Sequence, residues 1–327
     1  MKRGLIISQT QRINFNQDSF RMRDIKGIRD YFISNGYSID CASYAKSWDF
    51  NQISVLNDLD IDYNDYDSII LYNDTNNFFG GEIKAHTIPQ IIKLTQYTGN
   101  LFYVFTDPKL YKTCIHKIYN KGLLSKDIIY KYMNLEWTVI WPGTDMNVPF
   151  WGKIKEILYV DIFKYINRYL NHDRIEVNYN ERQYDLCYYG DYRDTRRKVF
   201  DKYFNNDINK LMVGMSGSKY NNAQYIKKCP QSDLPSWVSK SKASITIGDK
   251  SHNNNIITSR FIENNIYGII NFVDYEFDTN KRLYTDPILR EFNYVKNSEE
   301  LIFKVNSITE DLFYEIVGLQ DKEYYSA

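Results

Sequence analysis

Short runs of apolar residues alternate with longer amphipathic stretches along the chain, and this pattern limits the fold more than any other feature. Such runs are typical of strands buried on both faces of a parallel sheet. Apolar residues at helical spacing over 24–35 and 87–97 predict crossover helices, the first ending at the helix-stop pair Asn35-Gly36. The runs of this first series are residues 4–8, 37–43, 67–73, 100–106 and 137–141.

A second series of apolar runs begins after a polar region at residues 167–183. This change in composition places a boundary between two domains near residue 170. An amphipathic stretch over 298–318 predicts a helix near the C-terminus that crosses back to the first domain. The second series consists of residues 184–190, 210–215, 243–249 and 267–273, with helical spacing over 196–204.

The predicted architecture is therefore α/β, with two Rossmann-like domains whose parallel sheets face a central cleft. The first domain spans residues 1–170 and is joined by a C-terminal helix at 306–327, and the second domain spans 171–305. A length of 327 residues suits two domains of about 150 residues each.

The composition, 43% hydrophobic and 25% charged, is that of a globular chain. The apolar run at 5–7 is too short for a signal-peptide core, and no run approaches the ~18 residues of a membrane helix. We therefore expect a cytoplasmic protein. Four cysteines without metal-ligand spacing predict neither a disulfide nor a zinc site: Cys41, Cys114, Cys187 and Cys229.

The 41 basic and 41 acidic residues cancel, so net charge gives no support for nucleic-acid binding. Any contact with DNA has to come from a local patch of positive charge. The sequence carries no Walker A, GxGxxG, GxSxG or HExxH motif. His252 is a lone histidine in a polar stretch, and we assign no metal ligand.

Candidate site residues are sought just after the apolar runs, because ligands of doubly wound folds bind beyond the carboxyl ends of the strands. Gly80 and Gly81 follow the run at 67–73 and come after Asn77 and Phe79. Paired glycines let backbone N–H groups approach a ligand closely. A plain strand-to-helix turn is the alternative interpretation.

Asp107 stands at the end of the run at 100–106 and precedes Pro108. A carboxylate in this place suits a general base that takes the proton of an acceptor hydroxyl, and burial would raise its pKa toward that task. The alternative is that Asp107 caps a turn or a helix start ahead of the proline.

Gly190 closes the run at 184–190 and Asp191 follows it. Arg193 and Arg197 come next, four residues apart and on one face if helical. Two guanidinium groups there can clamp a diphosphate and stabilise the charge of a leaving nucleoside diphosphate. A solvated basic helix face is the alternative.

The run at 243–249 leads through Asp249 and an Asn-rich turn into a helix predicted to begin near Asn255. Arg260 and Glu263 lie three residues apart on this helix. A carboxylate here can accept both ribose hydroxyls of a nucleotide, as acidic residues do in other Rossmann sites. A surface Arg–Glu pair, worth about a few tenths of a kcal/mol, is the alternative.

These segments resemble, in order and spacing, the 5-hydroxymethylcytosine DNA glucosyltransferases, the DNA β-glucosyltransferase family of T-even bacteriophages. The resemblance spans nearly the whole chain and implies a GT-B fold. It also implies inverting transfer of glucose from UDP-glucose to 5-hydroxymethylcytosine in duplex phage DNA, with a β-linked product. The segments that carry it are residues 13–15, 76–81, 102–107, 185–197, 247–264 and 275–282.

The resemblance implies a role for each candidate residue. Asp107 matches the catalytic base of the family, and Asp24 sits where the family has a glutamate that contacts the transferred sugar. Arg193 and Arg197 match diphosphate-binding arginines, and Glu263 matches the ribose-binding glutamate. The implied donor-binding set is Asp24, Gly190, Asp191, Arg193, Arg197, Asp249, His252, Arg260 and Glu263, and the acceptor-binding set is Asn77, Phe79, Gly80 and Gly81.

Departures from the family leave alternatives open. His252 stands where the family has tyrosine, Asp191 replaces a serine and Tyr189 replaces a glycine. Another sugar donor, or another acceptor such as 5-hydroxymethyluracil DNA or a polysaccharide, is the second hypothesis. A nucleotide- or DNA-binding module without catalysis is the third. We expect a monomer that binds double-stranded DNA and a nucleotide sugar, and a role for Mg²⁺ or Mn²⁺ stays open.

Overall fold

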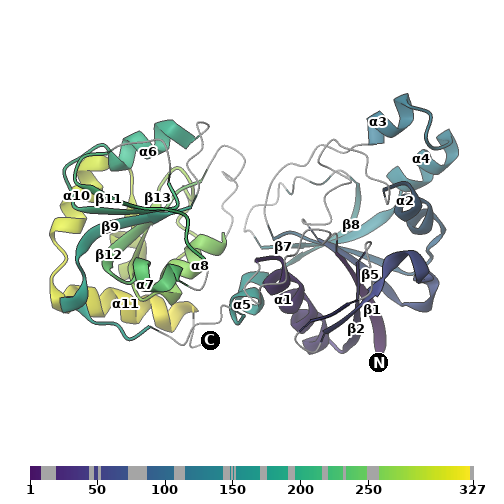
Figure 1. Cartoon of the computed structure of the whole chain (residues 1–327), viewed down its shortest axis with the longest axis horizontal. Helices are drawn as coiled ribbons and strands as arrows, with labels where there is room; N and C mark the ends of the chain where they lie inside the picture. Colours follow the sequence, from purple (N-terminus) through teal and green to yellow (C-terminus); the bar gives the residue numbers. More distant parts are fainter. Residues whose placement is uncertain are drawn as a thin grey trace. The chain divides into compact units, whose positions relative to one another are not determined.

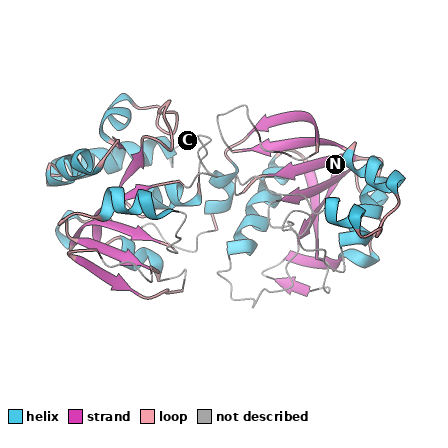
Figure 2. Ribbon diagram, turned by 90° about the horizontal axis from the view of Figure 1, so that it is seen from above, coloured by secondary structure: helices cyan, strands magenta, loops and turns pink. Residues whose placement is uncertain are grey.

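The computed structural model describes residues 1–8, 20–43, 48–50, 53–72, 87–106, 115–142, 148, 150, 152–169, 175–190, 196–215, 220–230, 233–248 and 258–324. The chain divides into two compact units, Met1–Leu170 and Asn171–Ala327. In each unit a mainly parallel sheet is flanked by helices (Figures 1 and 2). The prediction of two Rossmann-like α/β domains is confirmed.

The first sheet has eight strands. Seven of these strands are parallel and lie in the order β4-β2-β1-β5-β6-β7-β8, and β3 adds an antiparallel edge strand next to β4. The first strand pairs on both sides, with Ile6 opposite Cys41 and Ile70. In spatial order the strands are β3 (Trp48–Phe50), β4 (Ile53–Asn57), β2 (Tyr37–Ser43), β1 (Lys2–Ser8), β5 (Ser68–Tyr72), β6 (Asn100–Val104), β7 (Glu136–Trp141) and β8 (Lys153–Tyr159).

Helices cover both faces of this sheet. In Figure 1, α1 and α5 pack together on one side, and α2 and α4 pack together on the other. The helix-stop pair acts as predicted, because Gly36 has a φ of +85° and its N–H donates to the Ile33 carbonyl at 3.0 Å. The helices are α1 (Phe20–Ser34), α2 (Thr87–Gln96), α3 (Ile115–Asn120), α4 (Lys126–Met133) and α5 (Ile162–Asn167), with 3₁₀ turns at Asp58–Asp60 and Tyr63–Asp65.

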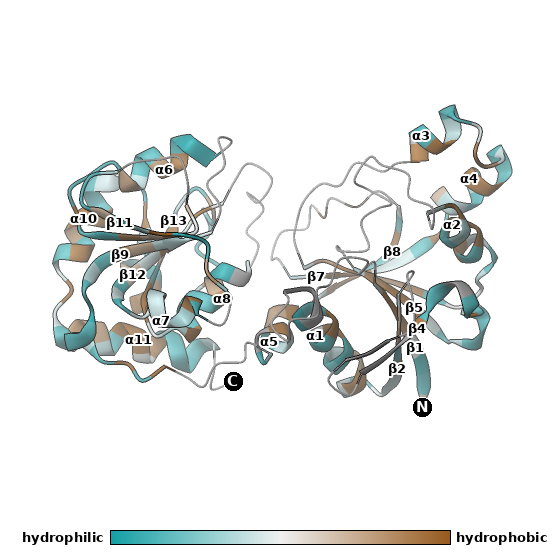
Figure 3. Cartoon of the chain, viewed as in Figure 1, coloured by the Kyte–Doolittle hydropathy of each residue, from teal (hydrophilic) through white to brown (hydrophobic). Residues whose placement is uncertain are grey.

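The second sheet has six parallel strands in the order β11-β10-β9-β12-β13-β14. Its first strand along the chain, β9, therefore lies between β10 and β12, and Leu186 of β9 stands opposite Lys210 and Ala243. The strands are mainly hydrophobic and the outer helices carry the polar residues (Figure 3). In spatial order the strands are β11 (Ala223–Ile226), β10 (Lys210–Val213), β9 (Tyr184–Tyr189), β12 (Ser241–Thr246), β13 (Ile270–Asp274) and β14 (Tyr294–Val295).

The second sheet is also covered on both faces, with α6 above it and α8 and α11 below it in Figure 1. No helix among the described residues has the length and apolar character to cross a bilayer. The helices of this unit are α6 (Arg197–Phe204), α7 (Leu234–Val238), α8 (Ser259–Ile266), α9 (Pro287–Phe292), α10 (Ser298–Asn306) and α11 (Glu310–Tyr324), with a 3₁₀ turn at Tyr179–Glu181.

A buried polar network fixes α8 and α11 against β12 and β13. The Oδ1 atom of Asn271 accepts hydrogen bonds from Thr246 and Asn264, both at 2.9 Å. The Oε1 atom of Gln320 accepts from the Asn271 N–H at 2.9 Å and from Asn293 at 2.7 Å. Each of these buried groups would be costly to leave unpaired, so the network sets the position of α8 on the sheet.

The C-terminal region differs from the single helix predicted over 298–318. Two helices form: α10 ends at Asn306, with Ser307 as its C-cap residue, and α11 begins at Glu310. The Thr309 hydroxyl accepts from the Leu312 N–H at 3.3 Å in the first turn of α11. Ser and Thr favour helix ends through such bonds, which apolar spacing alone does not reveal.

The compact division also groups α11 with the second unit, whereas the amphipathic pattern predicted a C-terminal helix joined to the first domain. Its buried face meets second-unit groups: Phe313 packs on the ring of Tyr179 at 5.5 Å, and Gln320 enters the polar network on β13. An amphipathic pattern shows that a helix buries one face, but it does not show which domain covers that face.

Candidate functional site

Two glycines mark the carboxyl end of the central strands of the second unit. Gly190 follows β9 with a φ of +124°, and Gly214 follows β10 with a φ of +80°, a region that favours glycine. The Gly190 N–H donates to the Val213 carbonyl at 2.9 Å, which keeps the two strand ends together. The strand order reverses beside β9, and open α/β sheets bind ligands at such switch points.

Arg260 extends from the first turn of α8 over Gly190. A Cβ atom on Gly190 would lie 2.5 Å from Arg260 Nη2, so the guanidinium occupies space that any other residue would fill. Arg260 Nη1 donates to the Tyr188 hydroxyl at 2.7 Å, and the guanidinium lies 4.5 Å from the Tyr188 ring centroid and 5.3 Å from that of Tyr189. Cation–π and hydrogen-bond contacts thus hold the cation in place.

One N–H donor of the Arg260 guanidinium is not used by the described residues. Arg260 Nε is buried and has no hydrogen-bond partner within the described part of the chain. A fixed arginine presents several N–H donors in a planar fork that fits phosphate and carboxylate groups. The end of β9 therefore offers a positioned cation and an unused donor to an anion.

Glu263 lies on the same helix as Arg260 and is buried, with 6% of its surface exposed. The surface-pair alternative therefore does not describe Glu263. Burial raises the pKa of Tyr189 well above its usual range, and the nearby Glu263 carboxylate adds to this shift. For Arg260, burial alone would lower the pKa, but Tyr188, Tyr189 and Glu263 outweigh it, so its pKa is raised. The site thus combines a neutral phenol with a permanently charged guanidinium.

The helix that carries Arg260 and Glu263 begins later than predicted. Thr258 has an extended backbone, its hydroxyl accepts from the Phe261 N–H at 3.3 Å, and the helix starts at Ser259 rather than near Asn255. A threonine N-cap is a strong start signal, but the preceding asparagines offered equally good caps in the sequence. Arg260 consequently stands in the first turn, where the helix dipole favours a bound anion.

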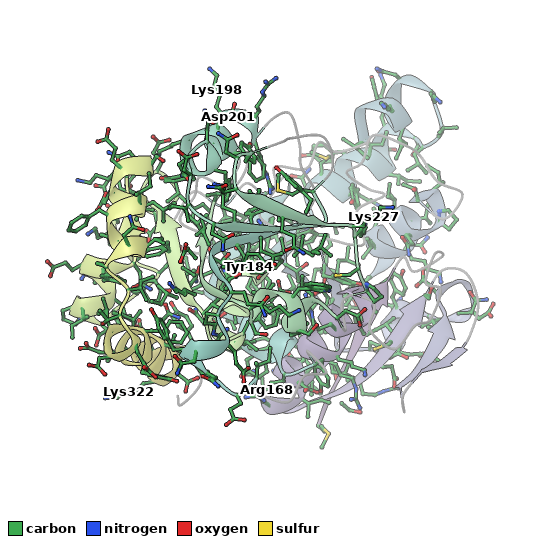
Figure 4. All side chains as sticks on the ribbon, turned by 60° about the vertical axis from the view of Figure 1, so that its left-hand side comes forward. Arg168, Tyr184, Lys198, Asp201, Lys227 and Lys322 are labelled. Carbon is green, nitrogen blue, oxygen red and sulfur yellow. The ribbon has the colours of Figure 1, made fainter. Side chains whose placement is uncertain are left out.

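Arg197 is the first residue of α6, and its side chain is 71% exposed. Its Nε lies 3.6 Å from an Asp201 carboxylate oxygen, one turn along the helix. Figure 4 shows Lys198 and Asp201 on the outward side of α6. In this state Arg197 fits the alternative of a solvated helix face, and its part in a diphosphate site stays a prediction.

The other candidates divide between the first unit and the undescribed segments. Asp24 lies on α1 in the first unit and is 2% exposed. Thr106, which precedes the predicted base, is buried just after β6. The candidates outside the described residues are Asn77, Phe79, Gly80, Gly81, Asp107, Asp191, Arg193, Asp249 and His252.

The described residues hold no cluster of three or more His, Cys, Asp or Glu side chains arranged as metal ligands. Within the same residues, Cys41 and Cys187 are buried free thiols, and Cys229 is a half-buried one.

Sequence reasoning missed Tyr188 as a contributor to the site, because it was counted only as a strand residue. Tyr189, noted as a departure from the family, is buried beside it in β9. The available signal for Tyr188 was its position two residues before Gly190, where a strand delivers side chains to the ligand end of the sheet.

The second unit thus has the strand order, the glycine turn and the helix N-terminus of a Rossmann-type nucleotide site, and the whole chain has the GT-B class of fold. No protein-family profile matches the sequence. The chain is 26% identical over 300 residues to the DNA beta-glucosyltransferase of Enterobacteria phage T4, covering 84% of this chain and 80% of that protein.

Solved structures agree with this likeness. The crystal structure of the T4 phage enzyme with its UDP-glucose substrate superposes with a TM-score of 0.74 at 20% identity, over 100% of this chain and 95% of that one. The same enzyme with UDP and Mn²⁺ gives a TM-score of 0.75 at 22% identity, with the same coverage. These superpositions establish the fold of this chain.

Proposed function

We propose that this protein transfers glucose from UDP-glucose to the hydroxymethyl group of 5-hydroxymethylcytosine in duplex DNA, with a β-linked product. The likeness to a DNA beta-glucosyltransferase over 84% of the chain carries the proposal. The position of Arg260 over Gly190, at the ligand end of the second sheet, supports it independently.

The second unit binds the donor in this proposal. Arg260 contacts the diphosphate together with Arg193 and Arg197, because guanidinium groups stabilise the negative charge that grows on departing UDP. Glu263 accepts hydrogen bonds from the ribose hydroxyls. The loops that enclose the donor contribute Gly190, Asp191, Asp249 and His252.

The first unit supplies the acceptor chemistry. Asp107 takes the proton of the hydroxymethyl group as that oxygen attacks C1 of glucose, and the bond from C1 to the diphosphate breaks with inversion. Asp24 contacts the transferred sugar. The target base has to leave the duplex stack to reach Asp107, and the segment with Asn77, Phe79, Gly80 and Gly81 receives it.

The T4 enzyme has been solved with UDP and Mn²⁺, so a divalent ion can accompany the nucleotide in an enzyme of this fold.

Incubation with UDP-glucose and a duplex that contains 5-hydroxymethylcytosine tests the proposal. We expect one glucose per modified base, and the anomeric coupling constant in an NMR spectrum of the released nucleoside should show the β configuration. Duplexes with 5-hydroxymethyluracil or unmodified cytosine, and UDP-sugars other than UDP-glucose, serve as comparisons. Transfer only to one of these acceptors, or only from another donor, would replace the substrate assignment.

Replacement of Tyr188 by phenylalanine should weaken donor binding. The change keeps the ring under Arg260 but removes the hydroxyl that accepts from Nη1 at 2.7 Å, so the guanidinium loses one of its anchors. A hydrogen bond of this kind is worth about 0.5–1.5 kcal/mol, which corresponds to a roughly two- to tenfold higher dissociation constant for UDP-glucose.

Tyr184→Phe is the matched control for this prediction. Tyr184, labelled in Figure 4, is the first residue of β9, at the opposite end of the strand from Tyr188, and its hydroxyl hydrogen-bonds to Gln224. Calorimetric titration with UDP-glucose should show a weaker complex for Tyr188→Phe and an unchanged one for Tyr184→Phe. Equal affinities for the two variants would contradict the anchoring role of Tyr188.

A further inference from the structure

The neutral net charge of the chain hides a strongly basic segment. Residues 108–135 contain six lysines and one acidic residue, Asp127. Removing this segment from the 41 basic and 41 acidic residues leaves 35 basic and 40 acidic residues in the rest of the chain. The lysines are Lys109, Lys112, Lys117, Lys121, Lys126 and Lys131.

The described part of this segment is the helical pair α3–α4, which presents its lysines to solvent. Lys117, Lys121, Lys126 and Lys131 are all exposed. The opposite side of the pair is apolar and turned inward: Ile115, Ile118 and Tyr132 are buried. The helices contact each other, α4 also contacts α2, and both show mixed polar and apolar colouring in Figure 3. The charged side is therefore separated from the packed side.

Large exposed side chains accompany the charges. Tyr119 is 47% exposed, Leu123 is 45% exposed and Tyr130 is 73% exposed. Tyrosine hydroxyls and lysine ammonium groups both donate hydrogen bonds to phosphate oxygens in protein–DNA complexes. Basic residues interleaved with exposed tyrosines thus suit a polyanion that offers closely spaced phosphates.

The turn between the two helices is well defined, so the surface is formed before any partner binds. Gly122 ends α3 with a φ of +62°, and the Leu123 N–H donates to the Ile118 carbonyl at 3.1 Å. Ser125 caps α4, accepting from the Ile128 N–H at 3.3 Å. A surface held by two helix caps loses little conformational entropy when it binds.

The segment also lies near the proposed base along the chain. Ile115 is eight residues after Asp107, and eight residues extend over at most about 28 Å. Duplex DNA carries one phosphate charge per ~1.7 Å of its axis, so a duplex that offers a base to Asp107 has many phosphates within that reach.

We propose that the exposed face of α3–α4, with Lys117, Lys121, Lys126 and Lys131, binds the phosphate backbone of duplex DNA. The proposal rests on the proposed function only in that DNA is the partner. The contact is independent of base sequence, because lysines on phosphates position a duplex without reading it. It supplies the local positive patch that the neutral net charge requires.

The experiment compares two quadruple variants with the same loss of charge. In the first, Lys117, Lys121, Lys126 and Lys131 are each replaced by glutamine. In the control, four exposed lysines from elsewhere are replaced in the same way: Lys2, Lys164, Lys296 and Lys322. Fluorescence anisotropy with an unmodified duplex of about 20 base pairs, at several salt concentrations, gives the affinity and its salt slope.

For the α3–α4 variant we expect affinity at ~0.1 M salt to fall at least tenfold, and the slope of log K against log salt to fall by about 0.9 for each lysine that contacts a phosphate. The control should change the slope by less than one such contact. Equal losses in both variants, or no loss in either, would overturn the proposal, since the contact would then be diffuse or lie elsewhere.

Two further measurements keep this result separate from the proposed function. UDP-glucose affinity and the thermal midpoint of unfolding show that each variant is folded. Because the duplex carries no hydroxymethylated base, the binding result does not depend on glucose transfer. Patch-dependent binding without transfer would leave this inference standing and remove the proposed activity, and transfer without patch-dependent binding would do the reverse.

Discussion

Replacement of Asp107 by alanine should abolish glucose transfer while UDP-glucose still binds. General-base catalysis contributes roughly 10²- to 10⁴-fold to a rate, so kcat on a 5-hydroxymethylcytosine duplex should fall by about that factor. The donor site lies on the second unit in our proposal, and its affinity for UDP-glucose should change by less than about twofold. Labelled glucose incorporated into DNA and calorimetric titration with UDP-glucose measure the two quantities.

Asp107→Asn and Asp65→Ala complete this experiment. Asparagine preserves the size of the side chain but takes no proton, so it should be as inactive as alanine. Asp65 is an exposed carboxylate in the first unit, on the 3₁₀ turn Tyr63–Asp65, and its removal should leave transfer unchanged. Retained turnover in Asp107→Ala would exclude Asp107 from the mechanism and favour its alternative role as a turn cap.

Replacement of Gly190 by alanine should damage the donor site through two separate effects. The first is backbone strain, because a φ of +124° costs a non-glycine residue about 1–3 kcal/mol. The second is steric, because the new Cβ would lie 2.5 Å from Arg260 Nη2 and would push the guanidinium off Tyr188. We expect the dissociation constant for UDP-glucose to rise at least tenfold, a loss of about 1.4 kcal/mol in binding free energy.

Gly36→Ala separates the two effects. Gly36 also has a positive φ, +85°, but no atom lies within 4 Å of the position of its Cβ. This variant should lose stability through strain alone and should bind UDP-glucose normally. Thermal unfolding measures the stability of both variants, and calorimetric titration measures their affinity for UDP-glucose. Normal donor affinity in Gly190→Ala would mean that the position of Arg260 over Gly190 is not needed for binding.

Much of the fold was readable in the sequence because buried strands of a parallel sheet have to be apolar on both faces. Each apolar run that was predicted to be a strand forms one in the structure: β1, β2, β5, β6, β7, β9, β10, β12 and β13. The strands that were missed are β3, β4, β8, β11 and β14, which stand at or next to sheet edges. β8 shows the reason: five of its seven residues, Lys153 to Glu156 and Tyr159, are exposed, so the strand has no buried apolar run in the sequence.

The candidate site, like the fold, could be predicted from the sequence only in part. The sequence alone indicated Gly190, Arg260 and Glu263, because each follows a strand or stands on the next helix in a Rossmann-like series. It left open whether Glu263 is a surface residue, and only its 6% exposure in the packed structure decided that. The role of Tyr188 was not visible at all, because a tyrosine in a buried strand looks like any other core residue.

What the sequence determined by itself is the order of the elements, the two Rossmann-like units and the residue types at the strand ends, since these follow from local periodicity and turn chemistry. Tertiary structure decided which strands became neighbours, and therefore that β9 lies between β10 and β12. Arg260 meets Tyr188 across 72 positions of chain for that reason. Such contacts depend on how distant segments pack, and no local pattern encodes them.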